Sequence, residues 1–341
     1  MGVTRQIKVG ILTAPHIEFE QRANTFILKN VRIGIGFHWD RYEDQEFAGT
    51  LTIRNNADGT QTAINTIDLE DYLCSVISSE MSANSPMELL KAHAVISRSW
   101  AIRAMQKPNH EGFDVCADDH CQRYEGLRRM SERAVEAVRA TAGQVLLYND
   151  EICDCRYYKC CGGKTEIWRT CWEDIDVPYI QSVRCDYCKS PSPKILRLVL
   201  NDYDRETKDF RDWKVTYKDE ELNEIIRTKS GIDFGEIIDL IPLHRGASGR
   251  IDQLRIVGTK HTEVIGKELK IRYWLSRSCL YSSWFEVAHE NGVWTLSGHG
   301  WGHGAGLCQI GAAVMATEGK TYEEILTYYY PGTRLNKKMR K

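Results

Sequence analysis

The chain has 341 residues, 27% of them charged, and a formal net charge of −2 at pH 7, so electrostatics gives no case for a nucleic-acid partner. This length can bury a sizeable core in two modest domains or one large domain without disulfides. Residues 1–13 lack the apolar core of a secretory signal and no stretch approaches the length of a membrane span, so we expect a soluble chain without an export signal.

The first half of the chain predicts strands followed by helices. Residues 1–66 read as a β-rich segment of short strands that packs on the rest of the chain. Asp68 caps a helix over 68–81, and Pro86 opens a second helix that runs to about residue 105. A third helix is expected over 131–141.

The second half mixes both element types. Strands are expected at 145–148, 153–159 and 251–274, and helices around 220–226, after Gly306 and behind the capping box Thr321–Glu324. The predicted fold class is therefore α+β, with a helical core of about residues 68–141 packed against mainly antiparallel β structure.

Two charged residues interrupt the apolar faces of the first two predicted helices. At about 100° per residue, Glu80 falls about 20° from Leu69, in the middle of an apolar stripe, and Arg98 falls near the centre of the stripe on the next helix. Antiparallel packing of consecutive helices would bring the two charges together, and pairing would solve the burial problem of each. Two interpretations are open: an ion pair that only locks the helices, or an acid of raised pKa held by a guanidinium.

The run Gly298–Gly306 places a glycine at every second residue. In an extended chain one side would be bare and the other would present His299, Trp301 and His303, a platform that suits a sugar or another flat polar ligand. Glycines here cost conformational entropy, so we expect either backbone close to the bare side or a ligand on the other side. A strand crossing tightly under another element also fits. The neighbouring Cys308 would need one of these histidines as a base to act as a nucleophile, and a small buried cysteine is the simpler interpretation.

Twelve cysteines are present, and reduced thiols with metal sites are favoured over six disulfides because no export signal is visible. The pattern H-x5-C-x4-C of His110, Cys116 and Cys121 predicts a zinc site, with water, the adjacent His120 or a distant residue as the fourth ligand. A chance cluster on a loop is the alternative. If zinc binds, we expect it to hold the loop in shape.

A second group of cysteines contains the C-x2-C motif of Cys185 and Cys188. Cys160, Cys161 and Cys171 lie upstream and could complete a four-thiolate site, but the spacing does not show which upstream pair serves. The candidate set is Cys160, Cys171, Cys185 and Cys188. A structural zinc, a disulfide and free thiols all fit this pattern.

Several segments together resemble the stage II sporulation protein D family, the SpoIID/LytB domain. They are Ser79–Met81, Glu88–Ala101, Cys161–Glu166, Pro178–Val183, Gly300–Ala312 and Tyr322–Thr333. Their order and spread make the resemblance specific, and it covers nearly the whole chain, from about Ile7 to Leu335.

The resemblance implies a reaction and a set of site residues. Family members include lytic transglycosylases, which cut peptidoglycan between N-acetylmuramic acid and N-acetylglucosamine. The family's catalytic glutamate falls on Glu80 and its helix arginine on Arg98, and Tyr179 completes the implied catalytic set. The positions expected to bind substrate are Lys164, Thr165, Trp301, His303 and Gln309, and family members with a metal loop resemble His110, Cys116 and Cys121.

One acid suffices for this reaction. Ordinary glycosidases use two carboxylates, whereas a lytic transglycosylase uses the C6 hydroxyl of its substrate as the attacking group, so Glu80 would act as acid and then as base. The alternatives are a non-catalytic, glycan-binding enhancer of a cell-wall amidase and a zinc–thiolate regulatory protein. The implied partners are peptidoglycan glycan strands and an amidase, the implied cofactor is structural zinc, and the family points to the cell envelope.

The domain organisation follows from this resemblance. We expect residues 1–66 to pack as a β-rich segment on a SpoIID-like catalytic region at 67–335, which carries a cysteine-rich insert at about 153–188. A basic tail is expected at 336–341.

Overall fold

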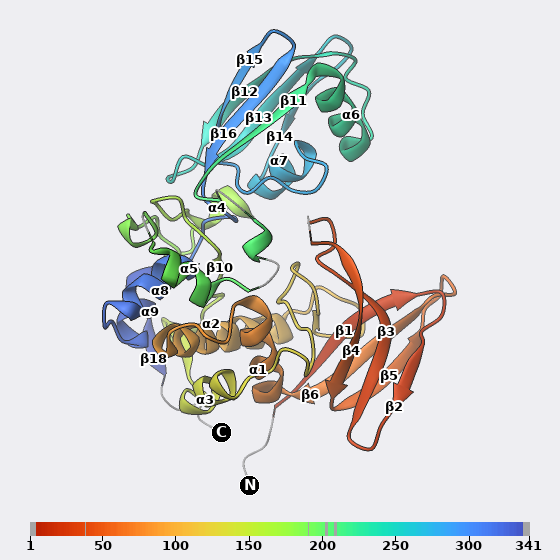
Figure 1. The fold of residues 1–341 in the computed structure, drawn as a ribbon, viewed down its shortest axis with the longest axis vertical. Helices are drawn as coiled ribbons and strands as arrows, with labels where there is room; N and C mark the ends of the chain where they lie inside the picture. The colour runs from red at the N-terminus through yellow and green to blue at the C-terminus, as the bar shows by residue number, and fades with distance from the viewer. Residues whose placement is uncertain (1–4, 38, 190, 202–203, 208–209, 337–341) are drawn as a thin grey trace.

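The computed structural model describes residues 5–336 except 38, 190, 202–203 and 208–209, so the predicted basic tail, apart from Asn336, lies outside the described residues. The fold is α+β, as predicted. Figure 1 shows amino-terminal sheets on one side of a group of helices, and a second β-rich body at the far end of the molecule.

The amino-terminal sheets confirm the predicted β-rich segment. Their strands are β1 (Gln6–Ala14), β2 (Phe19–Gln21), β3 (Thr25–Ile33), β4 (Arg41–Ala48), β5 (Thr50–Asn55) and β6 (Gln61–Asp68). In one sheet β6 lies between β5 and β1, and in the other β3 lies between β2 and β4. Ile7 and Val9 on β1, and Phe26 and Leu28 on β3, are fully buried, because residues two apart share one face of a strand.

Three helices follow close to the predicted bounds: α1 (Leu69–Glu80), α2 (Met87–Gln106) and α3 (Glu132–Ala140). Asp68 caps α1 by accepting a hydrogen bond from the Glu70 amide, and Ser131 caps α3 in the same way. The carboxy-terminal helices are α8 (Gln309–Thr317) and α9 (Tyr322–Tyr329), and the predicted capping box opens α9. α2 is the central element, since it packs against α1, α3, α8 and α9.

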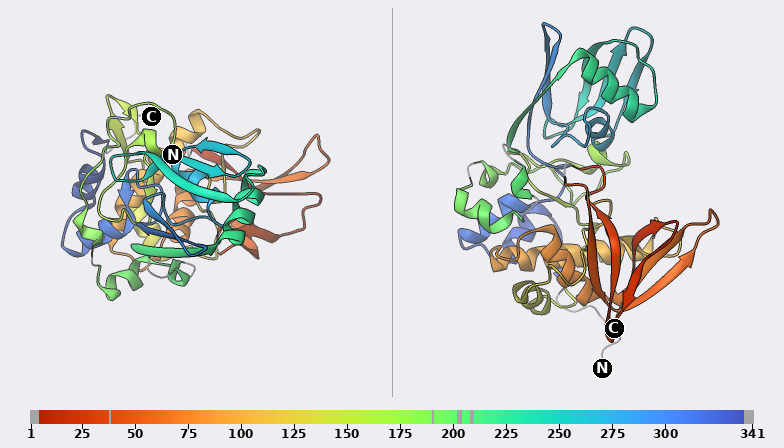
Figure 2. Two further views of the ribbon diagram at one scale, coloured as in Figure 1. Left: turned by 90° about the horizontal axis from the view of Figure 1, so that it is seen from above. Right: turned by 45° about the vertical axis from the view of Figure 1, so that its right-hand side comes forward.

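Residues 212–299 form the second β-rich body, which has its own hydrophobic core between Trp213 and Leu296. Its elements are β11 (Asp212–Lys218), α6 (Asp219–Ser230), β12 (Ile237–Arg245), β13 (Ile251–Gly258), β14 (Thr262–Ile265), α7 (Glu268–Trp274), β15 (Phe285–Glu290) and β16 (Val293–His299). They make two three-stranded sheets, β11-β16-β15 and β12-β13-β14. Figures 1 and 2 show this body reaching away from the helices, with α7 on the side that faces them.

Short elements connect the helices to the second body. They are β7 (Val115–Cys116), β8 (Val145–Tyr148), β9 (Glu151–Ile152), β10 (Tyr157–Tyr158), α4 (Trp168–Cys171), the 3-10 turns η1 (Asp186–Cys188) and η2 (Asp204–Glu206), α5 (Pro193–Val199), β17 (Leu307–Cys308) and β18 (Arg334–Asn336). Among the described strands only β1–β7 and β10–β17 pair in parallel.

Two predicted strands were partly wrong. The strand expected over 153–159 is reduced to the two residues of β10. The strands expected over 251–274 are β13 and β14, which end at Ile265, and residues 268–274 form α7 instead. Burial of Glu268, Ile271 and Arg272 in α7 follows the i, i+3, i+4 spacing of a helix face.

The glycine run is not an extended platform, which corrects that prediction. β16 ends at His299, and Gly300, Gly302, Gly304 and Gly306 all have positive φ values between 78° and 103°. These conformations favour glycine, so the chain turns at every second residue. The expected close approach is confirmed: a Cβ at Gly302 would lie 2.7 Å from the Cβ of Tyr158, and one at Gly306 would collide with the Arg156 carbonyl oxygen.

Candidate active site

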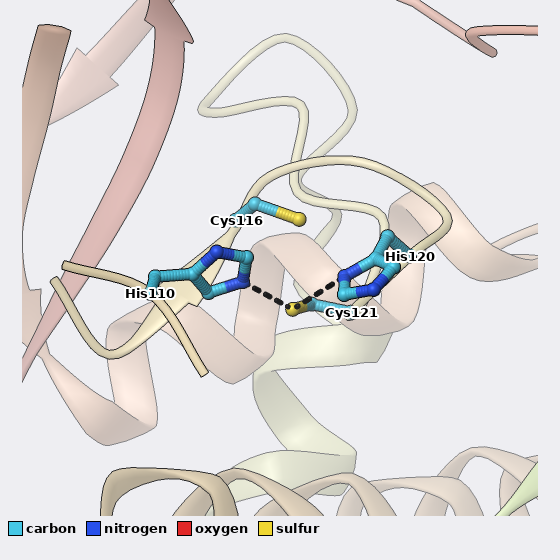
Figure 3. A group of neighbouring side chains, drawn as sticks. All are labelled: His110, Cys116, His120 and Cys121. Carbon is cyan, nitrogen blue, oxygen red and sulfur yellow. Dashed lines mark hydrogen bonds between the residues drawn. The ribbon is translucent and has the colours of Figure 1, made fainter. Parts of the chain in front are cut away.

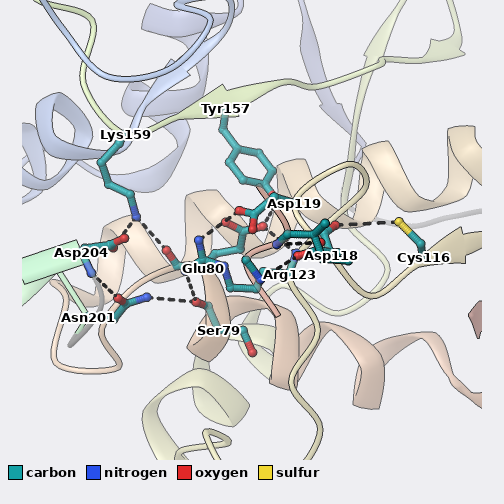
Figure 4. A network of polar contacts seen from close by, with 12 residues as sticks. Ser79, Glu80, Cys116, Asp118, Asp119, Arg123, Tyr157, Lys159, Asn201 and Asp204 are labelled. Carbon is teal, nitrogen blue, oxygen red and sulfur yellow. Dashed lines mark hydrogen bonds and ion pairs between the residues drawn. The ribbon is translucent and has the colours of Figure 1, made fainter. Parts of the chain in front are cut away.

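Glu80 is the last residue of α1, and it lines a cleft of about 1200 Å³. Its Oε1 atom accepts two hydrogen bonds, one from the backbone amide of Arg123 at 2.9 Å and one from the hydroxyl of Tyr157 at 2.8 Å (Figure 4). No described residue donates to Oε2. The carboxyl group is therefore fixed through one oxygen, and the other is available to a ligand in the cleft.

Polar side chains close the carboxy-terminal end of α1. The ammonium of Lys159 lies 2.9 Å from the carbonyl oxygen of Glu80 and 2.6 Å from Oδ2 of Asp204. Asn201 donates to the carbonyl oxygen of Ser79 at 3.1 Å. The last carbonyls of a helix lack partners within the helix and carry partial negative charge, so a cation and an amide stabilise this end. Figure 4 shows this network around Glu80.

The pKa of Glu80 is raised from its ordinary value, and the main cause is the removal of the carboxyl group from water. The positive charges of Arg123 and Lys159 oppose this rise, and the negative charge of Asp119 adds to it. Asp119 is itself paired with Arg123 at 3.0 Å. Because the net pKa is raised, Glu80 keeps its proton to higher pH than an exposed glutamate, as a general acid requires.

The cleft lies between the amino-terminal sheets, the loop that follows α2 and the second body. Aromatic side chains make up much of its wall; besides four tyrosines they are Phe37, Trp39, Trp100, Phe113, Trp168, Trp172 and Trp301. Such flat apolar surfaces pack well against sugar rings. The segment 267–273, at α7, lines the opposite side.

Trp301, His303 and Gln309, which were predicted to bind substrate, line this cleft. Nδ1 of His303 accepts a hydrogen bond from the Ala305 amide, and Nε2 lies 3.0 Å from the carbonyl oxygen of Tyr157, so Nε2 carries the proton. Burial holds the pKa of His303 well below its usual value. The ring is therefore neutral, and it fixes the backbone next to Tyr157.

Arg98 does not pair with Glu80, which corrects the central sequence prediction. Its guanidinium is fully buried and makes a two-pronged ion pair with Glu70, with Nε 2.8 Å from Oε1 and Nη2 2.6 Å from Oε2. It also donates to the carbonyl oxygen of Gln144. α2 folds back along α1 after a short connection. Because Arg98 lies far from that connection, it reaches the start of α1, where Glu70 is. The cation beside the Glu80 carboxyl is Arg123.

Three other predicted site residues lie outside the lining of this cleft. The hydroxyl of Tyr179 accepts a hydrogen bond from the Asp154 amide. Thr165 is fully buried and bonds the backbone of Gln181. Lys164 forms an isolated backbone bridge with Arg184. Two residues that do contact Glu80, Tyr157 and Lys159, lie in the segment predicted as a strand over 153–159.

Tyr157, Lys159 and Arg123 were not among the predicted site residues, although all three line the cleft. One signal was available: Tyr157 and Lys159 are two residues apart in a segment read as extended, so they share a face. Arg123 lies in a loop, where no period indicates which way a side chain points.

The predicted metal residues His110, Cys116 and Cys121 lie together, and His120 joins them. Their ligand atoms are all within 4.8 Å of one another. Nε2 of His110 is 3.2 Å from the sulfur of Cys121, and Nδ1 of His120 is 3.7 Å from the same sulfur (Figure 3). Two imidazoles and two thiols form a donor set that suits zinc. The group lines the cleft that contains Glu80.

The second cysteine group differs from the predicted set. The four thiols that lie within 4.8 Å of one another are Cys161, Cys185, Cys188 and Cys308. Of the other two predicted ligands, Cys171 lies apart, with its sulfur on the His303 carbonyl oxygen, whereas the thiol of Cys160 borders the group and contacts Cys188 and Cys308 without belonging to the four. The predicted ligand set was therefore half wrong, because the C-x2-C spacing cannot show which distant thiols meet it.

The histidine–cysteine pair considered near the glycine run does not form a nucleophilic site. Cys308 is fully buried and caps α8 by accepting a hydrogen bond from the Gly311 amide. His299 is exposed and contacts Asp212. Neither residue lines the cleft.

Comparisons with known proteins match two stretches of the chain. Residues 57–148 match the family model described as Stage II sporulation protein. The resemblance inferred from the sequence is confirmed. Residues 166–306 match a Domain of unknown function (DUF8618), and this match covers the later part of the cysteine-rich region and the whole second body.

Full-length relatives extend the similarity. The chain is 28% identical over 289 residues to "Stage II sporulation protein D" of Bacillus subtilis, which covers 80% of this chain and 76% of that protein. It is 28% identical over 289 residues to an uncharacterized protein of Brachyspira hyodysenteriae, covering 84% and 71%. It is 26% identical over 292 residues to the "Amidase enhancer" of Bacillus subtilis, covering 76% of this chain and 39% of that protein. Within the described part of the chain, no helix has the length and hydropathy needed to cross a membrane.

Proposed function

We propose that this protein is a peptidoglycan lytic transglycosylase. It cleaves the β-1,4 bond between N-acetylmuramic acid and N-acetylglucosamine and leaves a 1,6-anhydro product. The observation that carries the proposal is the carboxyl group of Glu80, which has a raised pKa, is fixed through Oε1 and leaves Oε2 to an aromatic-walled cleft. The resemblance to stage II sporulation protein D supports it.

The reaction needs one group that gives a proton and takes one back. Protonated Glu80 donates from Oε2 to the glycosidic oxygen as the bond between that oxygen and C1 of the muramic acid breaks. The resulting carboxylate then accepts the proton of the C6 hydroxyl as O6 bonds to C1. Glu80 gives one proton and takes one back, so it ends protonated, and no water is consumed.

The other acids of the cleft favour a mechanism with one carboxyl group. Asp119 is paired with Arg123, Asp204 with Lys159, and Glu268 of α7 with Arg272. A two-carboxylate glycosidase needs its second acid free as a nucleophile or base. These three carboxylates are already engaged by cations. The other acids of the cleft lining, Asp114, Asp118 and Glu173, accept hydrogen bonds from the Lys8 amide, from the Gly34 and Ile35 amides and from the Trp168 indole. Glu80, whose Oε2 receives no hydrogen bond from a described residue, is therefore the acid that we assign to proton transfer.

Tyr157 and the Arg123 amide act as positioning groups for Glu80. Both donate to Oε1, so the proton of the neutral acid is kept on Oε2. Trp301 supplies an aromatic contact for the glycan from the cleft wall, whereas Gln309 is buried behind that wall and pairs with His93.

We infer that zinc binds the group formed by His110, Cys116, His120 and Cys121, whose donor atoms fit it. Four protein ligands leave no open position, so this zinc holds the loop between α2 and Arg123 in shape. The Arg123 amide, which fixes Glu80, lies two residues beyond Cys121 in that loop.

The partners and location follow from the proposed substrate. The protein acts on peptidoglycan glycan strands in the cell envelope. The similarity to a relative named "Amidase enhancer" supports a second candidate, a non-catalytic glycan-binding module that acts with a cell-wall amidase.

The test is digestion of glycan strands stripped of stem peptides, with the products analysed by mass spectrometry. The wild-type protein should release fragments with 1,6-anhydro ends, and Glu80→Gln should release none, because the amide cannot donate and recover the proton. Glu136→Gln, an exposed change on α3, is the matched control and should be as active as wild type.

The outcome separates the two candidates. Fragments with ordinary reducing ends would indicate hydrolysis and refute the transglycosylase. Strands that stay intact but bind both the wild-type protein and Glu80→Gln would support the amidase-enhancing module.

A further inference from the structure

Four cysteines from distant parts of the chain meet in the core between the cleft and α9. Cys161 follows β10, Cys185 and Cys188 flank η1, and Cys308 ends β17. All four are fully buried, and their sulfur atoms lie within 4.8 Å of one another. All twelve cysteines of the chain are free thiols, so no disulfide explains this gathering.

The spacing of the sulfur atoms matches a tetrahedral metal site. Zinc–sulfur bonds of about 2.3 Å in a tetrahedron place neighbouring sulfur atoms roughly 3.8 Å apart. The four sulfur atoms fall within that scale, and the sulfur atoms of Cys161 and Cys188 are 3.0 Å apart. Four buried sulfur atoms at this spacing surround one central point, and a metal ion at that point would bond all four.

Backbone amides point at these sulfur atoms. The Gly163 amide donates to the sulfur of Cys161 at 3.3 Å. The sulfur of Cys308 accepts from the amides of Cys161 at 3.3 Å and of Gly311 at 3.4 Å. Amide donors of this kind stabilise thiolates and orient metal ligands. Two glycines among the donors let the backbone come this close.

A buried cation lies next to the group. The guanidinium of Arg250 is fully buried, and both Nη atoms are 3.4 Å from the carbonyl oxygen of Cys161. Four thiolates around a divalent ion carry a net charge of −2, and a nearby guanidinium offsets part of that charge.

We propose that Cys161, Cys185, Cys188 and Cys308 bind one zinc ion as a closed structural site. Four thiolate ligands select zinc or iron–sulfur chemistry among biological metals, and a site with four protein ligands has no position for substrate. On binding, the thiols release their protons and four zinc–sulfur bonds form. The site is separate from the histidine-containing group and independent of the proposed reaction.

The position of this zinc gives it a defined structural role. It joins three segments, two of which reach the cleft: Lys159, which bonds the end of α1, is two residues before Cys161, and the cleft residue Gln309 follows Cys308. Loss of the ion would release these segments together.

The experiment is metal analysis combined with X-ray absorption on the whole chain. Wild-type protein should contain about two zinc ions per chain, and zinc bound by four thiolates and by two thiolates plus two imidazoles should average about three sulfur neighbours and one nitrogen. His110→Ala should empty the other site and leave zinc with four sulfur neighbours at about 2.3 Å and no nitrogen.

Cysteine variants test the assignment of ligands. Cys188→Ser should lose about one zinc ion per chain, whereas Cys171→Ser, a buried thiol outside the group, should keep the wild-type content. If Cys188→Ser fails to fold, the X-ray absorption of the wild-type protein still decides the question.

Several results would overturn the proposal. One is a His110→Ala variant that contains no zinc, and another is a wild-type absorption spectrum with equal numbers of sulfur and nitrogen neighbours. The others are iron with acid-labile sulfide in place of zinc, and a disulfide among the four cysteines in a peptide map.

Discussion

Replacing Tyr157 by phenylalanine should raise the pKa of Glu80 and move the alkaline limb of the activity profile to higher pH. The hydroxyl of Tyr157 donates to Oε1 of Glu80 at 2.8 Å. Such a bond stabilises the carboxylate more than the neutral acid, so its loss favours the protonated form. The phenyl ring left by this substitution would keep the contact that Tyr157 makes with His93, so the change removes only the interactions of the hydroxyl, with Glu80 and with Gln122.

The size of the shift follows from hydrogen-bond energies. A bond to a charged acceptor contributes about 1.5–3 kcal/mol and a bond between neutral groups about 1 kcal/mol. The difference of about 1 kcal/mol corresponds to roughly 0.7 of a pKa unit. Glu80 keeps the amide of Arg123 as a donor, so stability should fall by only about 1 kcal/mol.

Two measurements check this shift. The pH dependence of kcat/KM on peptide-free glycan strands should show the alkaline limb displaced upward, because a general acid is active in its protonated form. A carbon-13 titration of glutamate side chains should show the same displacement for the resonance that is missing in Glu80→Gln. Tyr72→Phe is the matched control, since the hydroxyl of Tyr72 bonds Gln122.

The reasoning fails if Tyr157→Phe folds normally and the Glu80 titration is unchanged or moves to lower pH. It also fails if Tyr72→Phe moves the titration as much as Tyr157→Phe does. An inactive protein would still give the carbon-13 result, so the electrostatics and the reaction are tested separately.

Other variants test the remaining groups. Glu70→Ala leaves the buried guanidinium of Arg98 without its carboxylate and should lower the free energy of unfolding in urea by about 3 kcal/mol or more. Arg98→Met should lower the free energy of unfolding by less, because the Glu70 side chain is 34% exposed and can stay solvated. If the alkaline limb of the activity profile moved in this variant, Arg98 would have to act on Glu80. The folded-state pKa of Glu80 is raised. The free energy of unfolding of the wild-type protein, relative to that of Glu80→Gln, should therefore fall as pH rises above about 4 and level off beyond the folded-state pKa. Urea unfolding at a series of pH values that showed no such fall would contradict the raised pKa. His110→Ala should release one zinc ion and lower the thermal midpoint, whereas Glu136→Gln should change neither.

The fold was predictable where local chemistry decides it. Asp68, Ser131 and the Thr321–Glu324 capping box mark helix starts that the structure reproduces. The segment 267–274 was misread because its buried set includes Glu268 and Arg272, whose charges hide a helical period from a pattern based on apolar residues. Glu268 and Arg272 pair with each other on the buried face of the helix, so that face does not read as a continuous apolar stripe in the sequence.

The glycine run illustrates a limit of periodicity. Alternation of Gly298–Gly306 predicts an extended strand only if each residue has ordinary φ values. Four of the glycines instead adopt positive φ, and the need for them comes from Tyr158, Arg250 and Arg156, which press on the segment from other parts of the chain. The sequence therefore showed that something approaches closely, but a local pattern contains no information about which residue does so.

The partner of Arg98 illustrates how register limits a helical-wheel argument. The wheel identified Glu80 and Arg98 as inward-facing, yet in two helices joined by a short connection, residues meet when they are equally far from the turn. Glu80 is the last residue before the connection, whereas Arg98 lies more than ten residues beyond the start of α2 at Met87. At about 1.5 Å per residue this displaces Arg98 by roughly 15 Å along the axis, to the level of Glu70, where the ion pair is found. The angle of a side chain around its helix shows that it needs a partner, and its distance from the turn shows which partner it can reach. The cations that act on Glu80 then had to come from other segments, and the loop that carries Arg123 and the segment that carries Lys159 provide them.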